Sequence, residues 1–335
     1  MIRYFNIPIF IPELACPFQC IFCDQRKITG QKHIVNKEEI IGTIEEHLST
    51  IPKENTEVLI AFFGGTFTGL SLDNQKQYLE LAKPYILSKQ ISGIRISTRP
   101  DYINEDILKL LKEYNVTHIE LGAQSLIDKV LKESHRGHTY DDVRKASELI
   151  RENGFTLGLQ MMLGLPSDTK EYSKLTAQRI IEMGAQETRI YPTLVIKGTA
   201  LDLLLQKGKY MAMSTQDAVE QSAELYMLFL KNNVKVLRIG LYPDEGLLND
   251  EFVAGPDMHN FKEKVMTFVW RKKLLKLLNQ ENKDKRITIY VTKKQLNFAS
   301  GFKAANKIML LQTYRNVKFK VAEELKDFEF NVDYS

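Results

Sequence analysis

The three cysteines constrain this chain more than any other feature, because all of them lie between residues 16 and 23. Cys16, Cys20 and Cys23 are spaced C-x3-C-x2-C. Three neighbouring thiolates with no fourth suit three irons of a [4Fe–4S] cluster and leave the fourth iron open to a ligand that is not protein. From spacing alone, a zinc site completed by a histidine such as His33, or cysteines without a ligand, stay open. The odd cysteine count argues against disulfides, and the start Met1–Phe5 is too short and polar for a secretory signal.

The composition is that of an ordinary globular protein. Hydrophobic residues make up 44% of the chain and charged residues 26%. No apolar run approaches the roughly 18 residues that a membrane-spanning helix needs. The sparse use of cysteine is typical of a reducing cytoplasm, in which an iron–sulfur cluster survives. We therefore expect a cytoplasmic protein without membrane contacts.

The net charge of +4 is unevenly distributed along the chain. Residues 261–335 carry 17 Lys and Arg against 8 Asp and Glu, a net charge of +9, whereas residues 1–260 carry 29 against 34. A basic segment on a slightly acidic body suits an anionic partner such as tRNA. Lysines that merely keep a surface solvated are the alternative.

Short apolar runs alternate with helical patterns as far as residue 240, which predicts repeated βα units and a parallel sheet. Polar or glycine residues follow the expected strands, as at the catalytic face of α/β barrels. We therefore expect a partial (β/α)6 TIM-type barrel. An open doubly wound sheet is the alternative, although no G-x-G-x-x-G opens the first helix. The expected strands are Ile7–Ile11, Glu57–Phe63, Gly93–Ser97, His118–Leu121, Leu157–Leu163, Glu187–Leu194 and Lys235–Gly240; the expected helices are Lys37–Ser49, Asp73–Leu87, Asn104–Tyr114, Tyr140–Asn153, Tyr172–Met183 and Thr215–Asn232.

The pattern changes after Gly255-Pro256. The sequence predicts two parts: the barrel over residues 1–255, and a basic C-terminal extension over residues 256–335 that consists of a helix and a small βαβ-like unit. The expected elements of the extension are a helix at Phe261–Leu278, a strand at Arg286–Val291, a helix at Lys303–Tyr314 and a strand at Val317–Val321.

Several segments between Ile7 and Phe261 form distinctive motifs: CPFQCIFC, AFFGGTFTGL, RISTRPDYI, IELGAQS, RGHTYDDV, LGLQMMLGLPSDT, RIYPTLVIKGTAL and VAGPDMHNF. Together they resemble the radical S-adenosylmethionine (radical SAM) superfamily, most closely its elongator-type group without an acetyltransferase domain. The resemblance implies a [4Fe–4S] cluster on the three cysteines, at the open mouth of the barrel, with S-adenosylmethionine (SAM) on the open iron. One electron from the cluster then cleaves SAM to a 5′-deoxyadenosyl radical, which abstracts a substrate hydrogen. An electron donor such as flavodoxin or ferredoxin is implied as a partner.

The resemblance also implies which residues bind SAM. Gly64-Gly65-Thr66 follows an expected strand, where glycines let the backbone approach a small zwitterion; in the family this segment binds the methionyl amino group. Gln124, Arg136 and Gln160 match SAM-binding positions, since amides suit ribose hydroxyls and a guanidinium suits a carboxylate. Phe22 is expected to offer its backbone to the adenine. Taken singly, each residue is equally typical of a tight turn, a packed position or the surface.

Within this group, size and motifs resemble the queuine lyases, which cleave a carbon–nitrogen bond of the 7-deazaguanine base queuine and recover 7-aminomethyl-7-deazaguanine for queuosine salvage. Such a substrate requires a carboxylate for its amine and guanidine-like edge, and aromatic rings for stacking. Many relatives continue the AGP segment to His-Pro-x-Phe, whereas this chain has Asp257-Met258-His259-Asn260-Phe261, which indicates altered substrate contacts. The expected substrate residues are Phe67, Arg99, Asp101, Tyr191, Tyr242, Asp257 and His259. No catalytic side chain is identified.

Two other functions stay open. One is a radical SAM enzyme of the elongator type that modifies tRNA itself. The other is a non-enzymatic iron–sulfur or zinc protein.

Overall fold

The structure, a computed structural model, describes residues 2–11, 20–24, 27, 35–241, 251–278 and 285–335. The chain divides into two compact units. The first consists of Met1–Met213 with Phe229–Pro256, and the second of Ser214–Leu228 with Asp257–Ser335.

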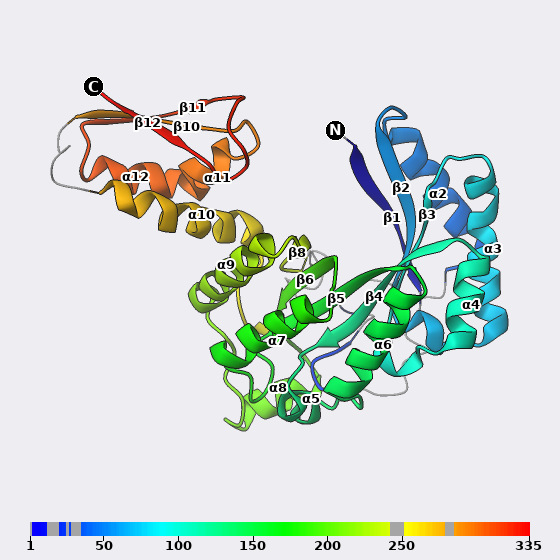
Figure 1. Cartoon of the computed structure of the whole chain (residues 1–335). Helices are drawn as coiled ribbons and strands as arrows, with labels where there is room; N and C mark the ends of the chain where they lie inside the picture. The colour runs from blue at the N-terminus through cyan, green and yellow to red at the C-terminus, as the bar shows by residue number, and fades with distance from the viewer. Residues whose placement is uncertain (1, 12–19, 25–26, 28–34, 242–250, 279–284) are drawn as a thin grey trace. The chain divides into compact units, whose positions relative to one another are not determined.

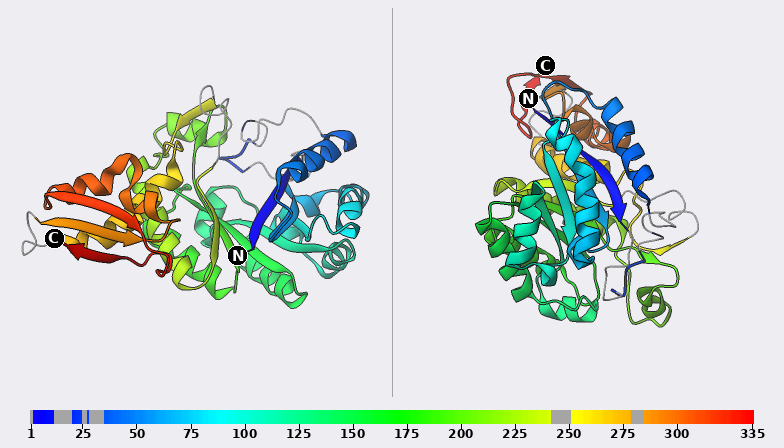
Figure 2. Two further views of the ribbon diagram at one scale, coloured as in Figure 1. Left: turned by 90° about the horizontal axis from the view of Figure 1, so that it is seen from above. Right: turned by 90° about the vertical axis from the view of Figure 1, so that its right-hand side faces the viewer.

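A parallel sheet forms the centre of the first unit (Figure 1). Within the described residues its strand order is β1-β2-β3-β4-β5-β6-β8, so each strand lies beside the next one along the chain. Helices α2, α3, α4, α6 and α7 lie on its outer side (Figures 1 and 2). The strands are β1 (Arg3–Ile11), β2 (Thr56–Gly64), β3 (Gly93–Thr98), β4 (Val116–Gln124), β5 (Thr156–Leu163), β6 (Glu187–Pro192) and β8 (Lys235–Ile239); the helices are α2 (Lys37–Thr50), α3 (Leu72–Leu87), α4 (Glu105–Glu113), α6 (Tyr140–Glu152) and α7 (Lys170–Glu182).

Contacts between strands that are not neighbours show that this sheet curls into a half-barrel. Arg95 on β3 reaches Glu187 on β6, with 2.6 Å between Nη2 and Oε2. Lys235 on β8 places its Nζ 4.2 Å from the centre of the Tyr4 ring on β1. Because β1 and β8 are the two edges of the sheet, this contact brings the edges together near the amino ends of the strands. The predicted partial TIM-type barrel is therefore confirmed.

Local signals explain where the principal elements begin. Asn36 and Glu39 form a capping box at the start of α2, and Thr139 and Asp142 form another at the start of α6. Strand β3 is buried along its whole length, as expected for a strand covered on both faces. Four short α-helices and strands of the first unit were not predicted: α5 (Asp128–Glu133), α8 (Ala200–Gln206), and β7 (Val195–Ile196), which pairs with β9 (Phe252–Ala254).

The second unit has a three-stranded sheet in the order β11-β10-β12 within its described residues. Strands β10 and β11 are parallel, as expected for a βαβ-like unit, and β12 adds an unpredicted antiparallel strand. The expected helix over Lys303–Tyr314 is shorter, because Lys303 and Ala304 have φ values of 52° and 58°. The elements are α9 (Thr215–Lys231, whose last residues belong to the first unit), α10 (Phe261–Leu274), β10 (Arg286–Val291), α11 (Leu296–Ser300), α12 (Ala305–Leu311), β11 (Asn316–Val321) and β12 (Asn331–Tyr334).

Candidate functional site

The cysteine turn is joined to the barrel by main-chain hydrogen bonds. The Cys23 amide donates to the Cys20 carbonyl over 3.0 Å, and the Leu201 amide donates to the Ile21 carbonyl over 2.8 Å. Cys20 is buried and Cys23 is half-buried. Phe22 is buried in the same apolar cluster, whose other buried members are Ile21, Val130, Leu165, Val195 and Leu201. Cys16 and the alternative zinc ligand His33 lie outside the described residues.

Arg136 contacts the Cys20 sulfur directly. It follows α5, and its side chain is buried, with Nη1 3.1 Å from Cys20 Sγ. Its Nη2 donates to the Gly122 carbonyl over 2.6 Å, which fixes the guanidinium at the carboxyl end of β4. Arg136 Nε is buried and has no hydrogen-bond partner among the described residues.

Gln124 lies on the other side of Gly122, at the last position of β4. Its φ of 63° is in the left-handed region, which turns the chain as the strand ends. A Cβ on Gly122 would lie 3.1 Å from Gln124 Nε2 and 3.4 Å from Arg136 Nη2, so both side chains crowd the same glycine. Gln124 Oε1 is buried without a hydrogen-bond partner in the described part of the chain. The structure therefore brings Cys20, Gln124 and Arg136 together.

The Gly64-Gly65-Thr66 segment ends β2. Gly64 has a φ of 108°, and a Cβ on it would lie 2.6 Å from the Ile11 carbonyl oxygen at the end of β1. Glycine is therefore required at position 64 by both conformation and space. Thr66 is buried, and Phe67 is fully buried with its ring 5.3 Å from that of Phe62. Phe67 is thus a core residue, and its ring is covered by protein.

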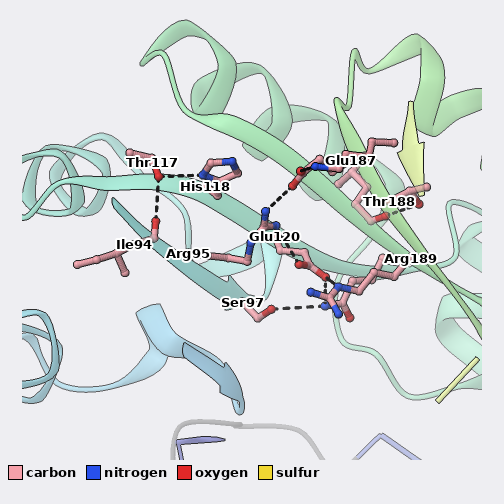
Figure 3. Close-up of polar contacts among 12 residues, drawn as sticks. Ile94, Arg95, Ser97, Thr117, His118, Glu120, Glu187, Thr188 and Arg189 are labelled. Atoms are coloured by element: carbon pink, nitrogen blue, oxygen red, sulfur yellow. Dashed lines mark hydrogen bonds and ion pairs between the residues drawn. The ribbon is translucent and has the colours of Figure 1, made fainter. Parts of the chain in front are cut away.

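Four buried charged residues form a network on the concave face of the sheet (Figure 3). The Glu120 carboxylate on β4 is the centre: Oε1 lies 2.5 Å from Arg189 Nε, and Oε2 lies 3.4 Å from Arg95 Nη1. Arg95 also pairs with Glu187, so two guanidinium groups face two carboxylates. Gln160 donates from Nε2 to Glu120 Oε1 over 2.6 Å. This predicted SAM-binding residue therefore belongs to the network.

Aromatic residues border this network on the same face. The Arg189 guanidinium lies 5.0 Å from the centre of the Phe63 ring, a contact between β6 and β2. Burial would lower the pKa of Arg189, but the Glu120 carboxylate and the Tyr191 hydroxyl together outweigh burial and raise it. The Tyr191 hydroxyl accepts a hydrogen bond from Arg189 Nη1 over 3.3 Å. Burial raises the pKa of Tyr191, so this hydroxyl is neutral at physiological pH.

The other expected substrate residues are distributed differently. Arg99 and Asp101 pair with each other, through Nε to Oδ1 over 3.0 Å and Nη2 to Oδ2 over 2.9 Å. Asp257 and His259 belong to the second unit, where His259 Nδ1 lies 2.7 Å from Asp257 Oδ1. Tyr242 lies outside the described residues.

The sequence reasoning missed Arg95, Glu120, Glu187 and Arg189. A signal was present, because a strand buried on both faces rarely carries charges. Arg95 stands within the strand GIRIST, Glu120 within VTHIELGAQ, and Glu187 and Arg189 within ETRIYP. A charge inside an apolar strand of this kind indicates a buried partner on another strand.

Comparison with known proteins decides the family. A model of the radical SAM superfamily matches residues 11–180, slightly more than half of the chain. The chain belongs to the radical SAM superfamily. A model of the radical SAM C-terminal domain matches residues 185–282 of this radical SAM protein.

The similar proteins carry names that indicate different activities. The heme chaperone HemW of Bacillus subtilis is 29% identical over 232 residues, which cover 68% of this chain and 58% of that protein. Elongator complex protein 3 of Homo sapiens is 30% identical over 204 residues, covering 58% and 36%. A tRNA uridine(34) acetyltransferase of Methanocaldococcus jannaschii is 26% identical over 195 residues, covering 52% and 36%. The chain thus spans less than two thirds of the length of each of these three proteins.

Among solved structures, Methanocaldococcus infernus Elp3 with an N-terminal deletion has a TM-score of 0.66 at 21% identity. The match covers 82% of this chain and 64% of that chain, which shows the shared fold. Among the described helices of the present structure, none is both long and apolar enough to cross a bilayer.

The residues around Cys20 fit the cluster and SAM that membership of the superfamily implies. Cys20 and Cys23 present two sulfurs on one turn, and neither is in a disulfide. Gln124 Oε1 and Arg136 Nε are buried polar atoms without hydrogen-bond partners among the described residues. Such buried polar atoms are costly unless a ligand satisfies them. The Gln124 and Arg136 side chains both crowd Gly122, and Arg136 also contacts the Cys20 sulfur.

Proposed function

We propose that this radical SAM protein is an enzyme that binds a [4Fe–4S] cluster through Cys16, Cys20 and Cys23 and cleaves SAM reductively. When bound, the cluster supplies the electron that converts SAM to methionine and a 5′-deoxyadenosyl radical. The observation that carries the proposal is the contact of Arg136 with Cys20 Sγ beside two orphaned buried atoms. An electron donor such as flavodoxin or ferredoxin would supply the reducing equivalent.

In this proposal the chain's own groups bind and orient SAM. Arg136 faces the methionyl carboxylate, because a guanidinium complements a carboxylate in two parallel hydrogen bonds. The Gly64-Gly65-Thr66 backbone binds the amino group, and Gln124 and Gln160 supply amides for the ribose hydroxyls. The backbone at Phe22 faces the adenine. Burial of Cys20 and Arg136 keeps water away from the reacting region, which protects a radical from side reactions.

We further propose that the substrate is queuine and that the reaction is cleavage of its carbon–nitrogen bond. The concave face supports a flat, polar base, because the Phe63 and Tyr191 rings border the charged network there. The balanced charges of the network favour an uncharged ring over a strongly anionic substrate. Asp101 is proposed to receive the substrate amine, with Arg99 holding its carboxylate in place.

Anaerobic reconstitution tests the enzyme itself. We expect about four irons per chain, and 5′-deoxyadenosine when SAM and dithionite are added. The Cys20→Ala variant should bind no intact cluster and release no 5′-deoxyadenosine. Bound zinc with no SAM cleavage would contradict the proposal.

Incubation of the reduced, reconstituted protein with queuine, and separately with bulk tRNA, tests the substrate. We expect a mass change in queuine to 7-aminomethyl-7-deazaguanine, measured by mass spectrometry, and none in tRNA nucleosides. Unchanged queuine in a reaction that does produce 5′-deoxyadenosine would refute the substrate and leave the SAM chemistry standing.

A second candidate function is modification of tRNA itself. It is favoured by the relative named tRNA uridine(34) acetyltransferase and by the net charge of +9 over residues 261–335. Lys318 and Lys320 are exposed on β11, on the face opposite the buried Val317. This function requires tRNA binding that weakens steeply as salt rises, since released counterions drive such binding. A nitrocellulose filter assay at two salt concentrations measures it.

A further inference from the structure

The buried Arg136 guanidinium has no acidic partner within the described parts of the chain. Its acceptors there are Cys20 Sγ at 3.1 Å and the Gly122 carbonyl at 2.6 Å. Arg136 is 7% exposed and Cys20 is 7% exposed, so water screens this contact poorly. A buried guanidinium is costly unless a negative charge compensates it. Ligation of a cluster through the Cys20 sulfur would place a compensating negative charge at this contact.

The backbone around Arg136 fixes this contact. His135 has a φ of 52°, which turns the chain sharply after α5, and the Arg136 amide donates to the Leu131 carbonyl over 3.0 Å. The Ile21 amide donates to the Ser134 carbonyl over 3.4 Å, which ties the cysteine turn to the same segment. The guanidinium and the sulfur are therefore held by one set of main-chain bonds, although the two residues are 116 positions apart.

We infer that Arg136 is a positioning residue that holds the Cys20 sulfur and makes the cluster easier to reduce. This inference rests on the proposed function, because it requires the cluster to be bound through Cys20. Reduction adds one electron to the cluster, from dithionite in the assay, and the added negative charge is shared with the ligating sulfurs. A cation that donates a hydrogen bond to one of these sulfurs stabilises the reduced form more than the oxidised form, which raises the reduction potential.

The test compares the reduction potential of reconstituted wild-type protein with that of Arg136→Gln, in the absence of SAM. Without SAM, any role of Arg136 in SAM binding cannot affect the measurement. A tenfold loss of preference for the reduced form corresponds to a shift of about 59 mV for a one-electron couple. We expect a shift of about this size to more negative potential in Arg136→Gln, measured by anaerobic dithionite titration with electron paramagnetic resonance detection.

Two further variants make the test specific. Gln124→Asn changes the neighbouring uncharged side chain and keeps a residue type that tolerates positive φ; its potential should equal that of the wild type without SAM. Arg136→Lys keeps the charge without the planar fork, and its potential should lie between those of the wild type and Arg136→Gln. If Arg136→Gln fails to hold iron, retention of the cluster by Arg136→Lys still supports the contact.

Equal potentials in the wild type and Arg136→Gln would overturn the inference, as would loss of the cluster from both Arg136 variants. Equal shifts in Arg136→Gln and Gln124→Asn would also overturn it, because the effect would then come from general disturbance of the site. A wild-type protein that binds no cluster would refute the proposed function itself, so the two failures are distinguishable.

Discussion

Glu120→Gln is expected to destabilise the barrel far more than the loss of a surface charge does. The substitution keeps the size of the side chain, removes its charge and replaces one acceptor oxygen by an NH2 donor. Glu120 is 1% exposed, and its carboxylate lies 2.5 Å from Arg189 Nε and 3.4 Å from Arg95 Nη1. Arg95 keeps its second carboxylate, Glu187, whereas Glu120 is the carboxylate that the structure pairs with Arg189.

The magnitude follows from the burial of Arg189. Its side chain is 10% exposed, so loss of the Glu120 charge leaves a buried and uncompensated guanidinium. Breaking a buried ion pair in this way costs about 3–5 kcal/mol. The matched control is Glu148→Gln on α6, whose carboxylate pairs with Arg144 but is 53% exposed. An exposed helical pair of this kind is worth about 0.3–0.5 kcal/mol.

Urea unfolding followed by far-ultraviolet circular dichroism measures both effects. The single tryptophan, Trp270, is fully buried in the second unit, where its Nε1 donates to Gln295 Oε1 over 2.8 Å. Tryptophan fluorescence therefore follows unfolding of the second unit alone. A circular dichroism transition that is not accompanied by a change in fluorescence reports unfolding of the barrel. The double variant Glu120→Gln/Arg189→Met completes a thermodynamic cycle.

We expect the double variant to be more stable than Glu120→Gln alone by more than about 1 kcal/mol, because it removes the stranded charge together with its partner. A cost of Glu120→Gln no larger than that of Glu148→Gln would refute the reasoning. A double variant less stable than Glu120→Gln would show that Arg189 contributes by packing on Phe63 instead of by charge.

Two further predictions follow from single residues. Gly64→Ala should lower the free energy of unfolding by at least about 2 kcal/mol, because of left-handed backbone strain and the clash with the Ile11 carbonyl. The control is Gly42→Ala in α2, where a Cβ meets nothing within 4 Å; it should raise the free energy of unfolding by up to about 1 kcal/mol. Equal effects of the two substitutions in urea unfolding would contradict the geometry. Burial, reinforced by Arg136 and Arg99, lowers the pKa of His138 to about 3, so the unfolded chain, with a histidine pKa of about 6.5, takes up the proton first as pH falls. Stability should therefore decline between pH 6.5 and 3, with about 2 kcal/mol lost from this group at pH 5; a His138→Asn variant with the same loss between pH 8 and pH 5 as the wild type would refute this assignment.

Local signals predicted the order of the barrel elements well. The strand expected at Leu157–Leu163 is observed at Thr156–Leu163, and the helix expected at Lys37–Ser49 is observed at Lys37–Thr50. These elements depend on apolar periodicity and on capping residues such as Asn36, which act within a few positions of the chain. The second unit was harder to predict. Lys303 and Ala304 lie outside the observed helix α12 because both have positive φ values, and neither residue is a glycine.

Part of the candidate site, like part of the fold, could be predicted from local sequence. The cysteine spacing, the Gly64-Gly65 pair and the IELGAQS segment can all be recognised as short motifs. The contact of Arg136 with Cys20 joins residues 116 positions apart, and no local pattern shows that this guanidinium lies on a sulfur. Phe67 illustrates the converse: its position after the glycines suggested a stacking ring, whereas the fold buries it against Phe62.

Short sequence motifs are sufficient to indicate the superfamily, the alternation of strands and helices, and the parallel sheet, because these properties depend on residue types at fixed short spacings. Which buried charges pair with one another depends on the folded barrel. Arg95, Glu120, Glu187 and Arg189 come from three strands, and the curl and register of the sheet bring their side chains within ion-pair distance. That curvature arises from the packing of the whole barrel, so the identity of each buried charge's partner is a property of the folded chain and not of any segment of it.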